Sequence, residues 1–172
     1  MEDIIYIACD DSGVELKSAI IGYLKEKGYA YLDCGSGEEP SRYPYYAAKV
    51  AAAVSSGKIK RGILLCGSGV GISIAANKFK GVRAALISDP YSARLTRRHN
   101  DSNILCLGGR MLGRWTALEI VDVWLNTAYD GGHHQPSLDL LAELENVTMT
   151  GDIWCPEQIP YPAFDWDPNQ SL

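Results

Sequence analysis

A thiol stands next to a glycine-rich turn in the middle of the chain. From Cys66 onward the sequence reads Cys-Gly-Ser-Gly-Val-Gly, so the thiol is followed by Gly67, Ser68, Gly69 and Gly71. Glycines lack the Cβ atoms that hold a ligand away from the backbone, so several N–H groups can converge on one anion. The pattern therefore predicts a nucleophile or base beside an anion-binding backbone.

Common motifs of other protein classes do not fit this loop. A dinucleotide fingerprint needs glycine where the chain has Ile72, and no Gly-Lys-Ser or Gly-Lys-Thr completes a P-loop. A cysteine phosphatase needs an arginine soon after its nucleophile, but the first one after Cys66 is Arg83. A phospho-acceptor domain needs an aspartate in place of Cys66 and a lysine in place of Gly108. These functions are disfavoured.

Further polar residues lie near the ends of other apolar runs, namely Asp10, Asp11, the His99–Asn100 segment and Arg110. The carboxyl ends of parallel strands share one edge of a sheet, where ligands bind. We therefore expect these side chains to join Cys66 there. Paired acids also serve as helix caps, so Asp11 or Ser12 is an alternative cap for the helix that follows.

The three histidines allow more than one interpretation. His99 opens a polar run over residues 99–103, which predicts a loop, so it is either a site residue or a solvated side chain. His133 and His134 suggest a metal, but adjacent residues rarely bind one ion together, and no cysteine or acid triad completes a site. We expect no metal.

Short apolar runs alternate with amphipathic segments along most of the chain. The runs are continuous, as in parallel strands that are buried on both faces. Strands are expected at residues 4–8, 29–33, 62–66, 82–87 and 104–107, and helices at 14–27, 44–57, 73–78, 90–98, 113–127 and 136–145. This alternation predicts an α/β fold of three αβα layers, Rossmann-like, with a five-stranded, mostly parallel sheet.

Composition and charge exclude several function classes. The 172 residues are 47% hydrophobic and 22% charged, which is typical of one globular domain. A net charge of −5 disfavours nucleic-acid and anionic-membrane partners. The acidic first residues and the lack of a long apolar run predict a cytoplasmic protein. Five cysteines form no Cys-x-x-Cys pair, and Cys9 and Cys106 are expected to be buried strand residues.

The composition changes at Val147. Residues 147–172 hold four prolines, two tryptophans, four acids and no basic residue. We therefore expect a main domain over residues 1–146 and an extended acidic segment over 147–172, packed on the domain or on a partner subunit.

Several segments together resemble the type B ribose-5-phosphate isomerase and galactose-6-phosphate isomerase family, over residues 4 to about 145. The segments that carry the resemblance are Cys9-Asp10, Tyr43-Pro44, residues 66–78, Gly81-Val82-Arg83-Ala84, Tyr91-Ser92-Ala93, residues 99–103 and Gly108-Gly109-Arg110.

The resemblance implies an aldose–ketose isomerase that works through a cis-enediol without metal or cofactor. It implies a homodimer or higher oligomer whose subunits share each active site. Cys66 is implied as the base that moves a proton between carbon 1 and carbon 2 of the sugar. Ser68 stands in the same loop where the family usually has threonine. His99 and Asp10 are implied as the acid and base for ring opening and hydroxyl protons. The implied substrate-binding residues are Asp11, Tyr43, Gly67, Gly69, Gly71, Asn100, Arg110 and His133.

The chain departs from the family where the family binds phosphate. Asp11 replaces a histidine, and His133 and Ser137 replace two arginines. Fewer cations weaken the binding of a phosphate dianion, although Arg110, His134 and a partner's arginines at 94–98 can compensate. The expected substrate is a pentose, tetrose or hexose phosphate. The alternatives are a non-phosphorylated sugar or a catalytically silent sugar-binding subunit of a hetero-oligomer.

Overall fold

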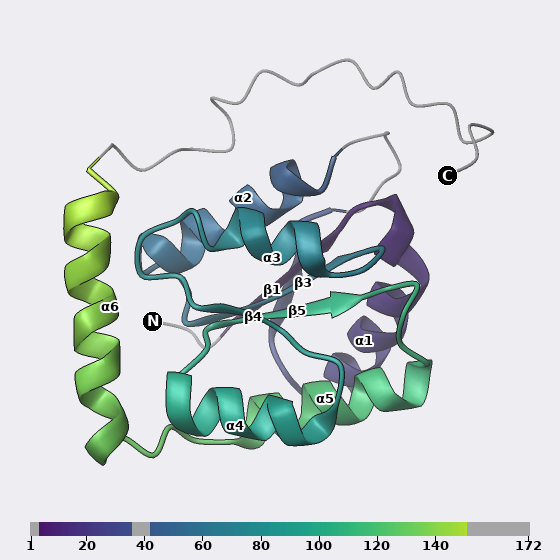
Figure 1. Ribbon diagram of the computed structural model, residues 1–172. Coiled ribbons are helices and arrows are strands. Elements are labelled where there is room, and N and C mark those ends of the chain that lie inside the picture. Colours follow the sequence, from purple (N-terminus) through teal and green to yellow (C-terminus); the bar gives the residue numbers. More distant parts are fainter. Residues whose placement is uncertain (1–3, 36–41, 151–172) are drawn as a thin grey trace.

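The computed structural model describes residues 4–35 and 42–150, and in this part of the chain five strands form one sheet (Figure 1). The strand order is β2-β1-β3-β5-β4, and all four pairings are parallel. The strands are β1 (Ile5–Cys9), β2 (Tyr31–Asp33), β3 (Arg61–Cys66), β4 (Ala84–Leu86) and β5 (Ile104–Gly108).

Helices cover both faces of the sheet, with α2 and α3 on one side and α1, α4 and α5 on the other (Figure 1). The helices are α1 (Val14–Glu26), α2 (Tyr43–Ser55), α3 (Val70–Ala76), α4 (Pro90–Asn100), α5 (Arg114–Asn126) and α6 (Gln135–Thr148), and the 3-10 turns are η1 (Asp11–Gly13) and η2 (Gly132–His134). The predicted three-layer, Rossmann-like fold is confirmed.

The core consists of two apolar layers, one on each face of the central strands. Alternate residues of β5 face opposite layers, so Leu105 packs towards α1 and α5 while Cys106 packs towards α2 and α3. Cys9 and Cys106 are fully buried, as the sequence predicts. Because both faces are covered, the strand ends are the places where polar side chains of the central strands reach solvent.

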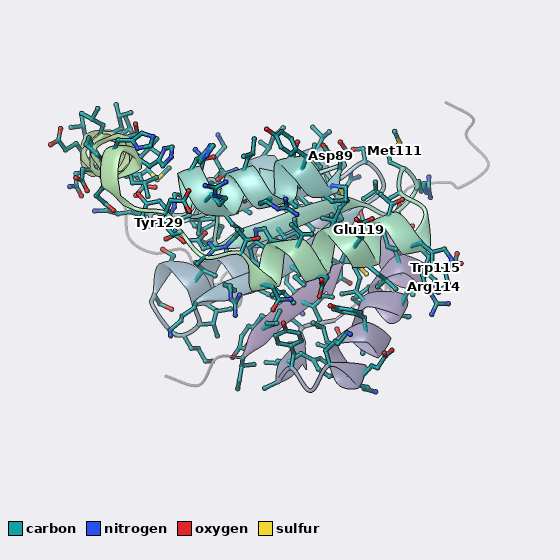
Figure 2. The ribbon with its side chains drawn as sticks, turned by 90° about the horizontal axis from the view of Figure 1, so that it is seen from below. Asp89, Met111, Arg114, Trp115, Glu119 and Tyr129 are labelled. Carbon is teal, nitrogen blue, oxygen red and sulfur yellow. The ribbon has the colours of Figure 1, made fainter. Side chains whose placement is uncertain are left out.

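Helix α6 stands apart from the three layers, and Figure 2 shows it almost end-on beside α4. Its apolar residues Leu140, Leu144 and Val147 are 60%, 58% and 76% exposed. A hydrogen bond from the Gly81 N–H to Glu145 Oε2, of 2.9 Å, joins the helix to the domain. None of the helices in residues 4–35 and 42–150 is long and apolar enough to span a membrane.

Several predicted boundaries differ from the structure. The second and fourth strands are three residues each, because β2 and β4 are edge strands with short ladders. The third helix ends at Ala76, before the predicted Lys78. Helix α6 ends at Thr148, so the first two residues of the predicted extended segment are helical. Residues 151–172 lie outside the described part of the chain.

The prediction of a loop at His99 and Asn100 is wrong, since both lie in the last turn of α4. Asp101 caps this helix in the left-handed conformation, with φ of 45°, and its carboxylate accepts hydrogen bonds from Arg83 at 2.9 Å and Arg97 at 2.8 Å. These two ion pairs stabilise the last turn of α4. The polar residues of this turn predict a loop when the sequence is considered alone.

Candidate active site

The glycine-rich loop joins β3 to α3 and holds the thiol of Cys66. The Gly69 N–H donates a hydrogen bond to Cys66 Sγ at 3.2 Å, and the Val70 N–H donates to Ser68 Oγ at 3.3 Å. The N–H groups of Gly71 and Ile72 belong to the first helical turn and have no acceptor within the helix. The loop thus places amide donors beside the sulfur atom of Cys66, a residue that is 4% exposed.

Glycine is required at position 69 by backbone conformation and by space. Its φ is +77°, and a Cβ there would lie 2.5 Å from Leu86 Cδ1 and 2.8 Å from the Leu107 carbonyl carbon. At Gly71 a Cβ would lie 2.8 Å from the Tyr43 ring. Tyr43 therefore packs directly on the loop, as expected for a side chain that lines the same site.

Asp10 lies beside the thiol because β1 and β3 are neighbours. Its N–H donates to the Leu65 carbonyl at 3.2 Å, one residue before Cys66. Its carboxylate accepts a 3.0 Å hydrogen bond from the Ser12 N–H, so Asp10, rather than Asp11 or Ser12, caps the turn that follows. Burial, together with the charge of Asp11, raises the pKa of Asp10 to about 6.

Arg110 reaches the same edge from the end of β5. The N–H groups of Gly109 and Arg110 donate to the carbonyls of Cys66 and Gly67 at 2.8 and 3.0 Å. The guanidinium attracts the Asp10 carboxylate and opposes the rise in its pKa. The carboxyl edge thus gathers a thiol, two acids, a guanidinium, a tyrosine and the glycine-rich loop. Such a set can move protons on carbon and oxygen while amide groups stabilise an oxyanion.

His99, Asn100 and His133 lie at the amino edge of the sheet, so the prediction that the His99–Asn100 segment lies at the carboxyl ends is wrong. The Asn100 carbonyl accepts a 2.9 Å hydrogen bond from Arg83, which directly precedes β4. The His99 and His134 rings are stacked, with centroids 4.3 Å apart, and the His133 ring lies 3.9 Å from that of His134.

The two edges are separated by the length of the strands. A five-residue strand such as β5 spans about 15 Å or more at roughly 3.3 Å per residue. Figure 2 shows Met111, Arg114 and Trp115, which follow the carboxyl end of β5, at the opposite end of the molecule from Tyr129 and α6. Within one chain, His99 and Cys66 therefore cannot reach the same substrate atom.

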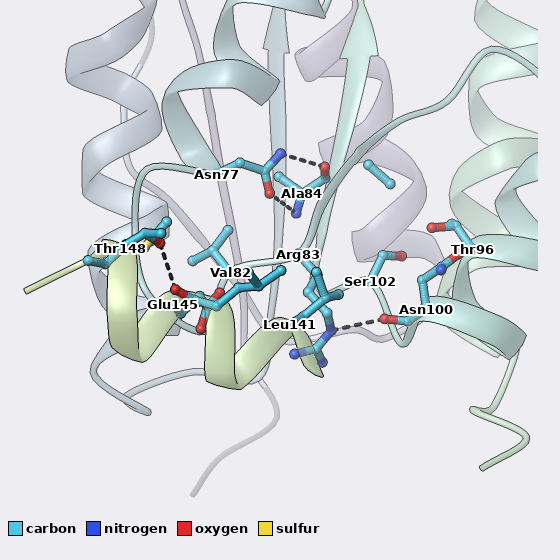
Figure 3. Close-up of a pocket in the computed structure, with 13 residues that line it drawn as sticks. Asn77, Val82, Arg83, Ala84, Thr96, Asn100, Ser102, Leu141, Glu145 and Thr148 are labelled. Atoms are coloured by element: carbon cyan, nitrogen blue, oxygen red, sulfur yellow. Dashed lines mark hydrogen bonds between the residues drawn. The ribbon is translucent and has the colours of Figure 1, made fainter. Parts of the chain in front are cut away.

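A cavity of about 440 Å³ lies at the amino edge, between α6 and the start of β4 (Figure 3). Its walls combine apolar residues of α6, Leu141 and Leu144, with polar groups of Arg83 and Asn100. Figure 3 shows the hydrogen bond between these last two residues at the rim. This cavity lies far from the Cys66 loop, so one chain presents two separate polar surfaces.

Sequence reasoning missed two features of the amino edge. One is the Asp101 carboxylate, whose pairing with Arg83 and Arg97 fixes the end of α4. The other is Asp130, which lies with His99 and His134 in a group of possible metal ligands. The local sequence carries no periodic signal for either, because the pairing of Asp101 with Arg83 and the approach of His99 to Asp130 and His134 join residues far apart in the chain.

Comparisons with known proteins agree on one family. A family model described as Ribose/Galactose Isomerase matches residues 5–141. Ribose-5-phosphate isomerase B of Escherichia coli (strain K12) is 48% identical over 142 residues, which cover 82% of this chain and 95% of the relative. D-erythrulose-4-phosphate isomerase of Pectobacterium atrosepticum is 39% identical over 145 residues, covering 83% of this chain and 95% of that protein.

Solved structures give the same result. The structure of Clostridium thermocellum ribose-5-phosphate isomerase B superimposes with a TM-score of 0.81 at 47% sequence identity, covering 84% of this chain and 98% of that one. At 47% sequence identity, this structural similarity supports membership of the same family as well as the same fold.

Proposed function

The chain belongs to the ribose/galactose isomerase family, and from this premise we propose how it catalyses its reaction and on which sugar. It is an aldose–ketose isomerase of sugar phosphates. A pentose 5-phosphate is the proposed first substrate, because the 48% identical relative is a ribose-5-phosphate isomerase. A tetrose phosphate is the second, since a 39% identical relative acts on erythrulose 4-phosphate.

Cys66 is the proposed carbon base. Its thiolate removes the proton from carbon 2 of the open-chain aldose, and the electron pair of that C–H bond forms the double bond of the enediolate. The carbonyl oxygen on carbon 1 takes up the negative charge. The hydroxyl proton on carbon 2 is then transferred to the oxygen on carbon 1, and the carbon-bound proton returns to carbon 1, which gives the ketose with its carbonyl on carbon 2. The observation that carries this assignment is the 3.2 Å hydrogen bond from the Gly69 N–H to Cys66 Sγ.

The loop around the thiol is the proposed oxyanion site. Backbone N–H groups of the glycine-rich segment are fixed before the substrate arrives, and fixed donors stabilise developing charge most effectively. Ser68 adds a hydroxyl whose oxygen is already oriented by the Val70 N–H. Gly67, Gly69 and Gly71 leave room for the sugar to approach these amides.

Asp10 is the proposed acid and base for the hydroxyl protons. A pKa of about 6 lets this carboxyl group both release and accept a proton near neutral pH. Asp11, Tyr43 and Arg110 surround it and are proposed to bind the sugar hydroxyls.

The active site is proposed to form between two copies of the chain. Ring opening and binding of the far end of the sugar are assigned to His99, Asn100 and His133. These three lie about 15 Å or more from Cys66 within one chain, the length of a five-residue strand. A second subunit that places its amino edge against this carboxyl edge supplies them. Symmetric pairing of two such edges makes two sites per dimer.

The proposed phosphate site is weaker in cations than that of the family pattern. His133 and Ser137 stand where that pattern has arginines, and imidazole carries a full charge only below its pKa. We therefore expect weaker binding of the phosphate than at a site that holds two arginines.

The test is isomerisation and solvent-proton exchange by purified protein. A panel of four- to six-carbon aldoses, each with and without phosphate, is incubated in D₂O and followed by NMR. Deuterium uptake on carbon 1 or 2 of a phosphorylated sugar supports the proposal. Uptake only on free sugars selects the non-phosphorylated alternative, and no uptake on any sugar indicates a silent subunit.

Cys66→Ala is expected to lower kcat/KM by about 10³-fold or more, in the range of a lost general base. Cys34→Ala is the matched control, because Cys34 is a free, half-buried cysteine beyond the end of β2. Full activity in Cys66→Ala, with normal activity in the control, would remove Cys66 from the mechanism.

A further inference from the structure

Three segments of the chain meet at the amino edge and bring possible metal ligands together. His99 comes from the last turn of α4, Asp130 from the connection after α5, and His134 from η2. One nitrogen of each imidazole and one carboxylate oxygen all lie within 4.8 Å of one another. The adjacent histidines in the sequence did not predict this site, because His99 lies far from Asp130 and His134 along the chain.

The carboxylate is already fixed in position. The Asp130 N–H donates to the Arg98 carbonyl at 3.0 Å. Asp130 Oδ2 accepts a 2.8 Å hydrogen bond from the Arg98 Nε–H and forms an ion pair with Arg98 Nη2, also at 2.8 Å. Among the described residues, Oδ1 of Asp130 takes part in no hydrogen bond. Carboxylates that bind metals are often held in this way: a neighbouring side chain binds one carboxylate oxygen, and the other oxygen is left to coordinate the ion.

The imidazoles are available for coordination. In the part of the chain that the structure describes, neither the His99 nor the His134 ring donates or accepts a hydrogen bond. An imidazole with a nitrogen free of other partners can bind a metal directly.

We propose that His99, Asp130 and His134 bind a divalent transition-metal ion of the zinc type. Two imidazoles and one carboxylate suit zinc, cobalt, nickel or copper, whereas magnesium and calcium prefer sites made of oxygens. In a tetrahedral zinc site with bonds of about 2.0–2.1 Å, ligand atoms are about 3.3 Å apart. Because the ligand atoms lie within 4.8 Å of one another, the two half-buried imidazoles need to move closer by at most roughly 1.5 Å on binding.

Metal binding has a functional consequence that rests on the proposed function. An imidazole nitrogen bound to a metal cannot accept a proton, so the ion competes with the role of His99 in ring opening. The ion is thus an inhibitor of the isomerase, and its removal restores activity.

The binding test uses cobalt(II) as a spectroscopic probe on the full-length protein under anaerobic, metal-free conditions. Tetrahedral cobalt gives a strong visible absorption band, and zinc displaces it. Asp130→Asn and His134→Gln are each expected to weaken cobalt binding by at least about tenfold, and Arg98→Gln by about 10- to 100-fold through loss of the outer partner. Glu119→Gln, which removes an exposed carboxylate from α5, is the matched control and keeps wild-type affinity.

Three results would overturn the proposal: no tetrahedral band, a sulfur-to-cobalt charge-transfer band that assigns the ion to a cysteine, or unchanged affinity in both Asp130→Asn and His134→Gln. Thermal unfolding checks that the variants are folded. Activity is a separate measurement: Asp130→Asn is expected to keep basal turnover and to need at least about tenfold more zinc for half inhibition. If the protein isomerises no sugar, the cobalt titration still decides whether the site exists.

Discussion

Asp10 shows how the burial of one carboxyl group in the proposed active site carries a cost in stability. The residue is 8% exposed, its carboxylate accepts one hydrogen bond from the Ser12 N–H, and Asp11 adds a negative charge nearby. Burial and Asp11 both disfavour ionisation, whereas the Ser12 N–H and Arg110 favour it. The result is a pKa of about 6, close to the pH at which a proton-transfer group works best.

Asp11→Asn is expected to move the acidic limb of the pH–kcat profile to lower pH. The charge of Asp11 raises the pKa of Asp10, so its removal lowers that pKa and keeps Asp10 ionised in more acidic solution. The measurement is kcat from pH 4.5 to 8.5. Glu15→Gln, an exposed acid in the first turn of α1, is the control. A limb that stays in place in Asp11→Asn would separate Asp10 from the rate-limiting proton transfer.

Asp10→Asn is expected to lower activity but to stabilise the fold above pH 6. The pKa of Asp10 is higher in the folded chain than its ordinary value of 3.8, so the native state binds the extra proton. The stability from this group is therefore fully present below about pH 4 and is lost as the pH rises through about 6. Asparagine keeps the acceptor for Ser12 without the charge.

The free energy of unfolding of Asp10→Asn, measured in urea at pH 7.5, is expected to rise by about 1–3 kcal/mol. The wild-type protein should lose stability between pH 4 and pH 6 from this group, and the variant should not. Equal pH dependence of the two proteins would contradict the raised pKa.

At the scale of elements, the loop between β3 and α3 has little freedom to vary. Gly69 is left-handed and touches β5, Gly71 touches the first turn of α2, and Gly109 and Arg110 bond to the loop from the end of β5. The strands, which are rigid because both faces are buried, thus fix the amide donors around the thiol. A loop held by three neighbouring elements does not need to reorganise during the reaction.

Gly69→Ala is expected to destabilise the protein by about 3 kcal/mol or more and to abolish activity. A Cβ there meets the backbone of Leu107 and Gly108 at 2.8 and 3.0 Å, in addition to the cost of a positive φ. Gly22→Ala in α1 is the matched control. It has open space around it, so it is expected to stabilise by about 0.5–1 kcal/mol. The measurement is urea unfolding, and two equal effects would contradict the role of the loop geometry.

At the scale of the whole molecule, the two sets of proposed site residues lie at opposite edges of one sheet. Cys66 and Asp10 follow strands, whereas His99 and Asn100 end a helix that returns to the start of β5. Helix α6 extends from the same edge as His99 and leaves Leu140, Leu144 and Val147 exposed. Both features support the proposal that a second copy of the chain completes the active site.

Mixing two inactive variants tests this arrangement. Cys66→Ala and His99→Asn are each expected to lose activity. After joint unfolding and refolding, half of the dimers contain one subunit of each kind, and each of these has one intact site. A shared site therefore predicts recovery of about a quarter of wild-type activity. A site within one chain predicts none. Refolding of each variant alone is the control, and size-exclusion chromatography confirms that dimers form.

The sequence by itself determined the fold class and the family, and it predicts the chemistry of the Cys66 loop. Continuous apolar runs, amphipathic segments and the Cys-Gly-Ser-Gly-Val-Gly spacing are local properties of the chain, and the fold, the family and the sugar-phosphate isomerase activity are confirmed. The assignment of individual site residues stays a prediction, which the variants above test.

Only the tertiary structure decided at which edge each polar residue lies. The sequence placed His99 in a loop, but Asp101, paired with Arg83 across 18 positions, keeps it in α4 and so at the amino edge. The same folding brings Asp130 to His99. An ion pair or a ligand cluster between distant residues depends on the packing of whole elements, and no local pattern of residue types encodes it.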